Sequence, residues 1–574
     1  MSVFALAVLL AQPAITQPKS DPFPDGTAQY HLAFDRIFPP EKTQREAFET
    51  ALRRLEAMRG HVTVSPKRAI ALYEEVLKTF ERYDAYLYLR YVTDTTNTAA
   101  QSEESNLSAD FEKRTAFLDS ELSQLTRNVV PYSFFTATAR SRRIHHLPLE
   151  KEETLRAVEP LTVEWTDEMY DVLTSQLPHS TSDSRAQAFH ARWDALAARR
   201  DLYAFTLIHL ANARNTIAQM HHFDDAASQI YARSFWTKAQ VTRLLDEIAA
   251  TAAVYTRYQL LRAEHAGGNL WDLNAPVPDR PRFTIDDART VLQAAFEPIG
   301  PRYSSALNNL LDPSEGRLDI TPGPHRRRGG FSKGFPGFRS VFYMSGFTGE
   351  YNDVRIIAHE STHAVQRQLE SEHGVRPVYA NGPGFLFEAY AIFNELLLPD
   401  FLYRQEANER RKQFYLEQFL ESKGIAVIFT TASEAAIEQA IYAGVARGTI
   451  RNADDLDALT RTIGSKYSIW PEKQDELRMQ WMQIPLMYDD PFYDVNYTWA
   501  GILALKFFAM YQRDPSHFMD RYAALIANGF DARPADLLRR FLGIDLYDPE
   551  LVRDAIAYVG PKIDELAAAY HQPQ

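Results

Sequence analysis

The residues most able to do chemistry are two histidines and a glutamate, His359, Glu360 and His363, which form the pattern H-E-x-x-H. Their flanks, 354–358 and 364–369, carry apolar residues at helical spacing and contain no Gly or Pro. Residues four apart share one face of a helix, so both imidazoles point the same way. They would supply half of a tetrahedral zinc site, and Glu360 could act as general base on a metal-bound water. The alternative is a soluble helix with two ordinary histidines.

A third ligand for such a site is expected downstream, in the apolar segment 384–398. This segment reads as a helix and carries only two carboxylates, Glu388 and Glu395, seven residues and hence two turns apart. A carboxylate in an apolar helix is costly unless it is paired or bound to a metal. We therefore expect Glu388 to complete a site for one Zn²⁺ per chain. Glu395 would not bind the metal itself but would orient one of its ligands through a hydrogen bond. The alternative is that one or both of these acids face solvent.

Tyrosines are dense in the segment 488–501, which contains Tyr488, Tyr493 and Tyr497. Tyrosine packs well at the border of apolar and polar surroundings. Its hydroxyl can also donate a hydrogen bond to an oxyanion during acyl-group chemistry. From spacing alone, core packing is the favoured interpretation of these residues.

The composition indicates a large globular protein and excludes some functions. The length of 574 residues favours two or more subdomains. A content of 45% hydrophobic and 24% charged residues is ordinary for a globular protein. The net charge of −13 argues against nucleic acid as a partner. Because cysteine is absent, any zinc must be bound by histidine and carboxylate.

The N-terminus carries a short apolar run at 3–11, followed by small and polar residues. The run is too short to span a bilayer but suits the core of a signal peptide. We therefore expect 1–17 to direct export to the periplasm or the medium. The alternative is a cytoplasmic protein with an apolar N-terminus, since the basic residues typical of a signal are missing. No other long apolar stretch suggests a stable membrane anchor.

The rest of the chain is predicted to be mostly α-helical, with an N-terminal helical region at 18–205 and a catalytic region at 206–574. Helix starts are expected at Pro66, at the capping box of Thr237 and Gln240, and near Thr284. The best strand candidate is 340–345, rich in β-branched and aromatic residues. Helices are also expected at 41–58, 110–125, 167–177 and 184–213, and an irregular segment at 274–283.

One further cluster has metal-binding residue types: His221 and His222, followed by Asp224 and Asp225. An exposed helix end explains the cluster more simply than a second metal site.

Several features of the catalytic region occur together in one known family. Asp353 and Val354 precede the metal helix, Glu388 follows His363 by 25 residues, and Glu395 ends a Phe-Asn-Glu triplet. Weaker matches lie at 272–276, 328–331, 346–349 and 492–497. In these features the chain resembles the thimet-oligopeptidase-like zinc metallopeptidases, and more closely their oligoendopeptidase F branch.

The resemblance implies a mostly α-helical, two-lobed, zincin-type fold with a small β-sheet beside the metal helix and a deep central channel. It implies a zinc-dependent endopeptidase that hydrolyses internal bonds of short peptides. Alternatives are a carboxypeptidase or dipeptidyl carboxypeptidase, or a catalytically weak peptide-binding homologue. The resemblance also favours Tyr497 as oxyanion donor, with Tyr488 or Tyr493 assisting as substrate-binding residues. The oligomeric state stays open.

Three positions depart from the pattern of this family. Thr362 replaces the usual Gly before the second histidine, Gln366 replaces a usual His, and Leu486 stands where a substrate-contacting His is common. None of them removes a zinc ligand or the base, so we expect them to alter substrate contacts.

Overall fold

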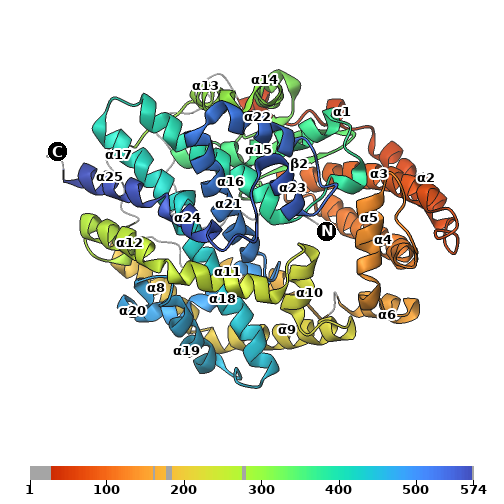
Figure 1. The fold of residues 1–574 in the computed structure, drawn as a ribbon, viewed down its shortest axis with the longest axis horizontal. Helices are drawn as coiled ribbons and strands as arrows, with labels where there is room; N and C mark the ends of the chain where they lie inside the picture. Colours follow the sequence, from red (N-terminus) through yellow and green to blue (C-terminus); the bar gives the residue numbers. More distant parts are fainter. Residues whose placement is uncertain are drawn as a thin grey trace.

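Three long helices form the centre of the protein: α15 (Tyr351–Glu372), α16 (Gly384–Gln405) and α21 (Asp494–Arg513). Nearly every side chain of α16 from Phe385 to Asp400 is buried. A helix that is apolar on all sides must be enclosed by other elements. Accordingly, α16 packs along both α15 and α21, and the three helices lie near the middle of the view in Figure 1.

This computed structural model describes residues 27–159, 162–163, 165–175, 177, 184–273 and 280–571. The expected signal peptide at 1–17 and the part 274–279 of the expected irregular segment lie outside the described residues. The described chain is mostly helical with one small sheet, which confirms the predicted fold class. No helix among the described residues is both long and apolar enough to cross a membrane.

The sheet has three strands in the order β1-β3-β2, namely β1 (Leu318–Asp319), β3 (Phe338–Met344) and β2 (Gly330–Phe335). β1 pairs with β3 in parallel, and β2 pairs with β3 in antiparallel fashion. Both β2 and β3 pack on α15, so the sheet lies beside the helix that carries the two histidines. The strand expected at 340–345 is β3, which begins two residues earlier and ends one residue earlier.

The N-terminal helices form a second hydrophobic cluster together with residues of β2 and β3. They stand together at one side of Figure 1, in red and orange. Their bounds are α1 (Phe34–Ile37), α2 (Glu41–Glu56), α3 (Pro66–Thr93), α4 (Thr98–Ser123) and α5 (Ser133–Ser141).

The remaining helices complete the main core and a third cluster around α9, α18 and α19. Those before the sheet are α6 (Leu149–Glu159), α7 (Thr166–Ser175), α8 (Arg185–Ala197), α9 (Arg200–Met220), α10 (Ala226–Arg233), α11 (Lys238–Ala250), α12 (Ala252–Ala266), α13 (Ile285–Phe296) and α14 (Pro301–Leu311). Those after α16 are α17 (Glu409–Gln418), α18 (Ala426–Ala446), α19 (Ala453–Gly464), α20 (Trp470–Lys473), α22 (Pro515–Ile526), α23 (Pro534–Leu542), α24 (Leu551–Ala557) and α25 (Gly560–Tyr570).

Local signals place most helix starts where the sequence predicts them. Pro66 is the first residue of α3, and Thr237 and Thr284 form capping boxes at the starts of α11 and α13. The single helix expected at 184–213 is wrong, because the chain turns between α8 and α9. α8 packs on the 3₁₀ helices η4 (Leu270–Asp272) and η9 (Asp475–Gln483), and α9 packs on α18, α10, α19 and η9, so the two helices meet largely different elements. The predicted region boundary at 205/206 falls within α9 and stays a prediction.

Candidate metal centre

His359, Glu360 and His363 lie in the middle of α15, where the helix is regular on both sides. The helix begins with a capping box in which Glu350 and Asp353 bind each other's backbone N–H groups. Asp353 also accepts hydrogen bonds from the backbone N–H and the hydroxyl of Thr348, at 2.6 and 2.7 Å. The start of α15 is therefore fixed to the loop that follows β3, and the helix holds its histidines at a set position beside the sheet.

Three potential metal ligands converge between α15 and α16. His359 Nε2 lies 3.2 Å from His363 Nε2 and 3.2 Å from Glu388 Oε2. His363 Nε2 lies 3.9 Å from the same carboxylate oxygen. That oxygen is buried and has no hydrogen-bond partner among the described residues. The two nitrogens and the oxygen form the one group of three His or carboxylate ligand atoms found within the described chain, all within 4.8 Å of one another.

Glu395, the second acid of α16, lies behind His359. Its Oε1 is 2.5 Å from His359 Nδ1, and its Oε2 accepts a hydrogen bond from Arg355 Nη1 at 2.6 Å. Lys423 Nζ lies 3.6 Å from Oε1. A carboxylate in this position fixes the imidazole ring and its tautomer, so that Nε2 faces the ligand cluster.

Charge in this cluster favours a bound cation. Burial alone would lower the pKa of His359, but the carboxylates of Glu395 and Glu388 outweigh it and raise that pKa to about 10. Burial would raise the pKa of Glu388, but His359 and His363 hold it below its usual value. Burial lowers the pKa of His363 to about 4, so this imidazole is neutral and able to bind a metal. The carboxylates that favour a proton on His359 would equally favour a metal cation in its place, so the residues present fit a metal ion with two nitrogen ligands and one oxygen ligand.

Glu360 is placed to exchange a proton at this site. Its side chain is buried, and its Oε2 has no hydrogen-bond partner among the described residues. Burial raises the pKa of this carboxyl to about 8, while a hydrogen bond from the backbone of Ser332 on β2 acts in the opposite direction. A carboxyl group with a pKa near neutrality can take up and release a proton under ordinary conditions.

Of the three tyrosines, Tyr493 contacts the ligand cluster and Tyr497 packs against Tyr493. The Tyr493 hydroxyl donates a long hydrogen bond of 3.4 Å to Glu388 Oε1, and its ring packs edge-on against the ring of Tyr497 at 5.3 Å. Burial raises the pKa of Tyr497 well above its usual value, and the nearby charge of Glu388 adds to this effect. Both hydroxyls therefore stay protonated and can donate hydrogen bonds beside the metal group.

Tyr488 does not join them. Its ring stacks on Tyr170 at 4.8 Å and meets Tyr203 edge-on at 6.3 Å, within the third hydrophobic cluster. Tyr488 follows the 3₁₀ helix η10 (Pro485–Met487), and a turn separates it from α21, so dense tyrosines in the sequence end in two different environments. Core packing, the interpretation favoured by spacing alone, describes Tyr488, and the substrate-binding role expected for it has no support in this placement.

Two of the three departures from the family pattern occur in buried polar contacts of α15. Thr362 Oγ1 accepts hydrogen bonds from Asn394 Nδ2 at 2.7 Å and from the Tyr303 hydroxyl at 3.3 Å, which joins α15 to α16 and α14. Gln366 donates to Glu370 on the same helix at 3.0 Å. Leu486 is buried in the main core. Thr362 and Gln366 therefore support the helix that carries the histidines.

Two cations of the site, Arg355 and Lys423, were not predicted from the sequence. Arg355 precedes His359 by four residues and so lies on the same face of α15, a spacing that could have revealed it. Lys423 lies in a short π-helical turn, η8 (Phe419–Gly424), far from Glu395 in the sequence. Only the packing of this turn on α16 brings the two together.

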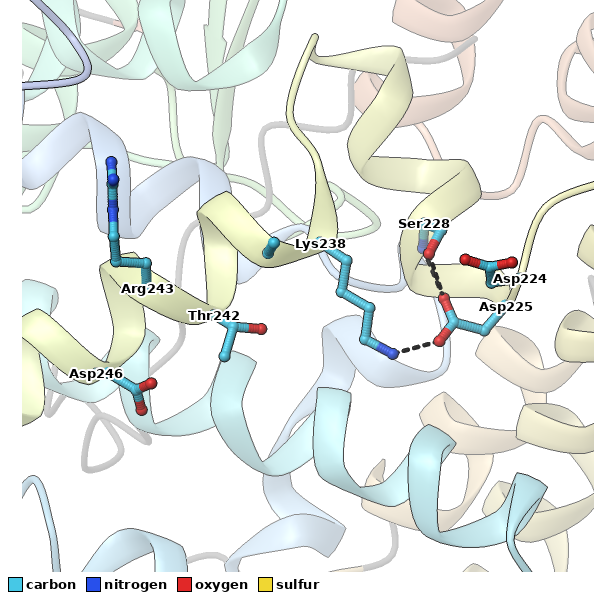
Figure 2. Close-up of a pocket in the computed structure, with 8 residues that line it drawn as sticks. Asp224, Asp225, Ser228, Lys238, Thr242, Arg243 and Asp246 are labelled. Atoms are coloured by element: carbon cyan, nitrogen blue, oxygen red, sulfur yellow. Dashed lines mark hydrogen bonds and ion pairs between the residues drawn. The ribbon is translucent and has the colours of Figure 1, made fainter.

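The second cluster of metal-binding residue types does not form a metal group. His221 caps the end of α9 and pairs with Glu152 at 3.1 Å, whereas Asp225 caps α10. A surface pocket of about 520 Å³ lies beside it, between α10 and α11. Figure 2 shows Asp225 pointing toward both Lys238 and Ser228, so this acid is already paired.

A helix with the H-E-x-x-H pattern, a glutamate ligand from a second helix and a flanking sheet together define a metallopeptidase. The family follows from comparison with known sequences. Residues 177–554 match the profile of Peptidase family M3, and the chain belongs to this family.

Among characterised relatives, the chain is 22% identical to Oligopeptidase PepF of Bacillus subtilis, in an alignment that covers 96% of this chain and 89% of the relative. It is 22% identical to the chromosomal oligoendopeptidase F of Lactococcus lactis subsp. cremoris, over 68% of this chain and 65% of the relative. These findings confirm the predicted kinship with the oligoendopeptidase F branch.

Solved structures share the fold. A putative peptidase from Chlamydophila abortus superposes with a TM-score of 0.78 at 19% identity, covering 94% of this chain and 99% of that chain. An oligoendopeptidase F from Enterococcus faecium superposes with a TM-score of 0.67 at 18% identity, covering 92% and 98%.

Proposed function

We propose that this protein is a zinc-dependent endopeptidase that hydrolyses internal bonds of short peptides. The observation that carries the proposal is the convergence of His359 Nε2, His363 Nε2 and Glu388 Oε2 next to the buried carboxyl of Glu360. Two imidazoles and one carboxylate, with no sulfur, form a ligand set that is common for catalytic zinc. When bound, zinc supplies a water of lowered pKa and polarises the substrate carbonyl.

In this proposal Glu360 acts as the base and then as the acid. Its carboxylate accepts a proton from the attacking water and later donates it to the leaving amine. Glu395 holds His359 in place through Nδ1, at 2.5 Å, and keeps the opposite ring nitrogen directed at the metal position.

Tyr497 and Tyr493 are the proposed hydrogen-bond donors to the oxyanion that forms when the carbonyl is attacked. Both stay protonated, and Tyr493 already lies 3.4 Å from the ligand Glu388. A well-placed donor to an oxyanion contributes about 3 kcal/mol to catalysis.

Strand β2 is the proposed docking edge for the substrate. It is an edge strand, it packs on α15, and the backbone of its Ser332 reaches Glu360. An extended peptide that adds to such an edge would bring one of its own carbonyls to the catalytic group. The names of the relatives, oligopeptidase and oligoendopeptidase, support short peptides and internal bonds.

The test is to incubate a defined mixture of peptides with the protein and to identify the products by mass spectrometry. We expect internal cleavage that stops when a chelator removes the metal and returns when zinc is added. Release of single residues or dipeptides from the C-terminus would instead identify a carboxypeptidase or a dipeptidyl carboxypeptidase. Binding of peptides without any products at full zinc occupancy would identify a peptide-binding homologue.

We also propose that the protein is exported through residues 1–17. Support comes from the apolar run at 3–11 and the small residues that follow it. The mass of the mature protein from a bacterial host tests this proposal. Loss of an N-terminal segment together with recovery outside the cytoplasm is expected, whereas a full-length cytoplasmic product would reject export.

A further inference from the structure

We propose that Glu438 is a positioning residue for the catalytic tyrosines, because it fixes the backbone of Phe492 from which Tyr493 and Tyr497 follow. Glu438 lies on α18, and the tyrosines lie at the start of α21, a helix that packs along α18. The inference rests on the proposed function, which assigns the tyrosines to the oxyanion.

Phe492 has a backbone conformation that needs outside support. Its φ is +63°, in the left-handed region that a bulky side chain rarely adopts. Such a conformation is unfavourable for a residue with a Cβ and persists only where the surroundings enforce it. The ring of Phe492 packs against the rings of Tyr442 and Tyr231, with centroids 4.6 and 5.5 Å away. Its side chain is therefore held by packing, in addition to the left-handed conformation of its backbone.

Glu438 supplies a specific contact to this turn. Its Oε2 accepts a hydrogen bond of 2.8 Å from the backbone N–H of Phe492, and its side chain is fully buried. The other oxygen, Oε1, has no hydrogen-bond partner among the described residues. A carboxyl group in an apolar interior is costly, and this one does not complete a metal group. The hydrogen bond from the Phe492 N–H is the contact that the structure shows for this carboxyl group.

The other end of the same segment is also tied by side chains. Arg214 donates to the backbone carbonyls of Met487 at 2.8 Å and Tyr488 at 3.2 Å. The Thr166 hydroxyl donates to the Tyr488 carbonyl at 2.9 Å. Three side chains from three other helices thus bind the backbone of an irregular segment. Each satisfies a backbone N–H or carbonyl in a stretch whose own hydrogen bonds form only short turns.

The fixed turn leads directly to the metal site. Tyr493 follows Phe492, and its hydroxyl passes so close to Gly384 that a Cβ there would lie 3.1 Å away. One turn further, Asn496 Oδ1 accepts the backbone N–H of Phe385 at 3.1 Å, which joins the starts of α21 and α16. The Tyr493 hydroxyl itself donates a hydrogen bond to Glu388 on α16. A small rotation at Phe492 would therefore move both tyrosine hydroxyls relative to the metal ligands.

The protonation of Glu438 gives a conservative variant. Burial, with the nearby charge of Asp494, raises the pKa of Glu438 well above its usual range. This shift favours the neutral form, and Glu438→Gln keeps the shape of the side chain and an acceptor oxygen for the Phe492 N–H. Glu438→Met keeps the volume but removes the acceptor. Glu438→Asp shortens the side chain by one methylene, which moves the acceptor oxygen away from the Phe492 N–H. This variant replaces Glu438→Met in the experiment if the methionine variant does not fold.

The experiment is a double-mutant cycle between Glu438 and the tyrosine pair, with kcat, KM and zinc content measured for each variant. We expect Glu438→Met or Glu438→Asp to lower kcat by about tenfold or more, at unchanged zinc content and with little change in KM. Glu438→Gln should restore kcat to within a few-fold of the wild type. In a Tyr493→Phe, Tyr497→Phe background, the same Glu438 changes should have less than a twofold effect, because the hydroxyls they position are gone.

Glu417 on α17 offers a matched control. It is also buried, accepts a hydrogen bond from Tyr570 at 2.9 Å and pairs with Arg262 at 3.1 Å, so Glu417→Gln perturbs a buried glutamate away from Tyr493 and Tyr497. Its kcat should equal that of the wild type. The positioning role would be overturned if Glu438→Met lowered kcat equally in the wild-type and the double tyrosine backgrounds. It would also be overturned if Glu438→Met did not lower kcat in the wild-type background, or if Glu438→Gln lowered kcat as much as Glu438→Met does. A wild-type kcat for the double tyrosine variant would instead reject their oxyanion role in the proposed function.

Discussion

Replacing Glu395 by glutamine should weaken metal binding strongly, because three donors surround its two oxygens. His359 Nδ1 and Arg355 Nη1 lie at 2.5 and 2.6 Å, and Lys423 Nζ lies at 3.6 Å. An amide offers one acceptor oxygen and one NH₂ group. In either orientation, Glu395→Gln therefore points a donor at another donor, inside a fully buried site.

The expected size follows from the role of the carboxylate behind a metal-binding histidine. Loss of such a partner typically costs 10- to 100-fold in metal affinity, or about 1.4–2.7 kcal/mol. We expect the loss of metal affinity to fall in the upper half of this range, because the amide both removes a hydrogen bond and points its NH₂ group at another donor. The same variant should also lose stability, since Arg355 and Lys423 keep their charge in a largely buried site without the buried anion.

The assay is competition for zinc with a chromogenic chelator at constant pH, on wild type and Glu395→Gln. Asp400→Asn is the matched control, because Asp400 lies on the same helix and pairs with Arg404 at 2.9 Å, away from the ligands. The control should bind zinc as tightly as the wild type. A zinc dissociation constant for Glu395→Gln within twofold of the wild type would refute the role assigned to this carboxylate.

Two further predictions concern stability. Thr362→Val removes one of the two acceptors of Asn394 Nδ2 and the acceptor of the Tyr303 hydroxyl, so the free energy of unfolding should fall by about 1–3 kcal/mol while zinc content stays unchanged. Denaturant unfolding checks this, and an unchanged stability would contradict it. Glu56 receives two hydrogen bonds from Arg114, at 2.7 and 3.0 Å, which hold its pKa below the usual value. Its contribution is therefore present above about pH 4.5 and lost as the pH falls through its folded-state pKa. Glu56→Gln should thus be less stable than the wild type at pH 6, and this difference should shrink as the pH falls through the folded-state pKa of Glu56. A pH-independent difference would count against this ion pair.

The parts of the site that rest on helical periodicity were predictable from the sequence. Spacings of four and seven residues put His359 with His363, and Glu388 with Glu395, on common helix faces, and a helix keeps that relation in any fold. The apolar surroundings of the two acids signalled that they are buried, as the structure has them. Helix starts with capping residues were predictable for the same local reason.

The parts that depend on how distant segments meet were not predictable. Lys423 reaches Glu395 only because a π-helical turn packs on α16, and Tyr488 leaves its neighbours because the chain turns sharply at Phe492. A left-handed phenylalanine has no sequence signal of the kind that glycine or asparagine provides. Likewise, strand β2 contains glycines and a lysine and lacks the β-branched pattern that revealed β3.

We propose that Glu360 exchanges the proton at a metal site built by His359, His363 and Glu388. The most direct test is Glu360→Gln, with zinc content and kcat measured on the same preparation. Glu372→Gln, an exposed change near the end of α15, is the control and should behave as the wild type. We predict one zinc per chain in Glu360→Gln and a fall in kcat of at least 10²- to 10⁴-fold, the usual contribution of a general base. A variant that binds zinc fully and cleaves peptides at the wild-type rate would contradict the account.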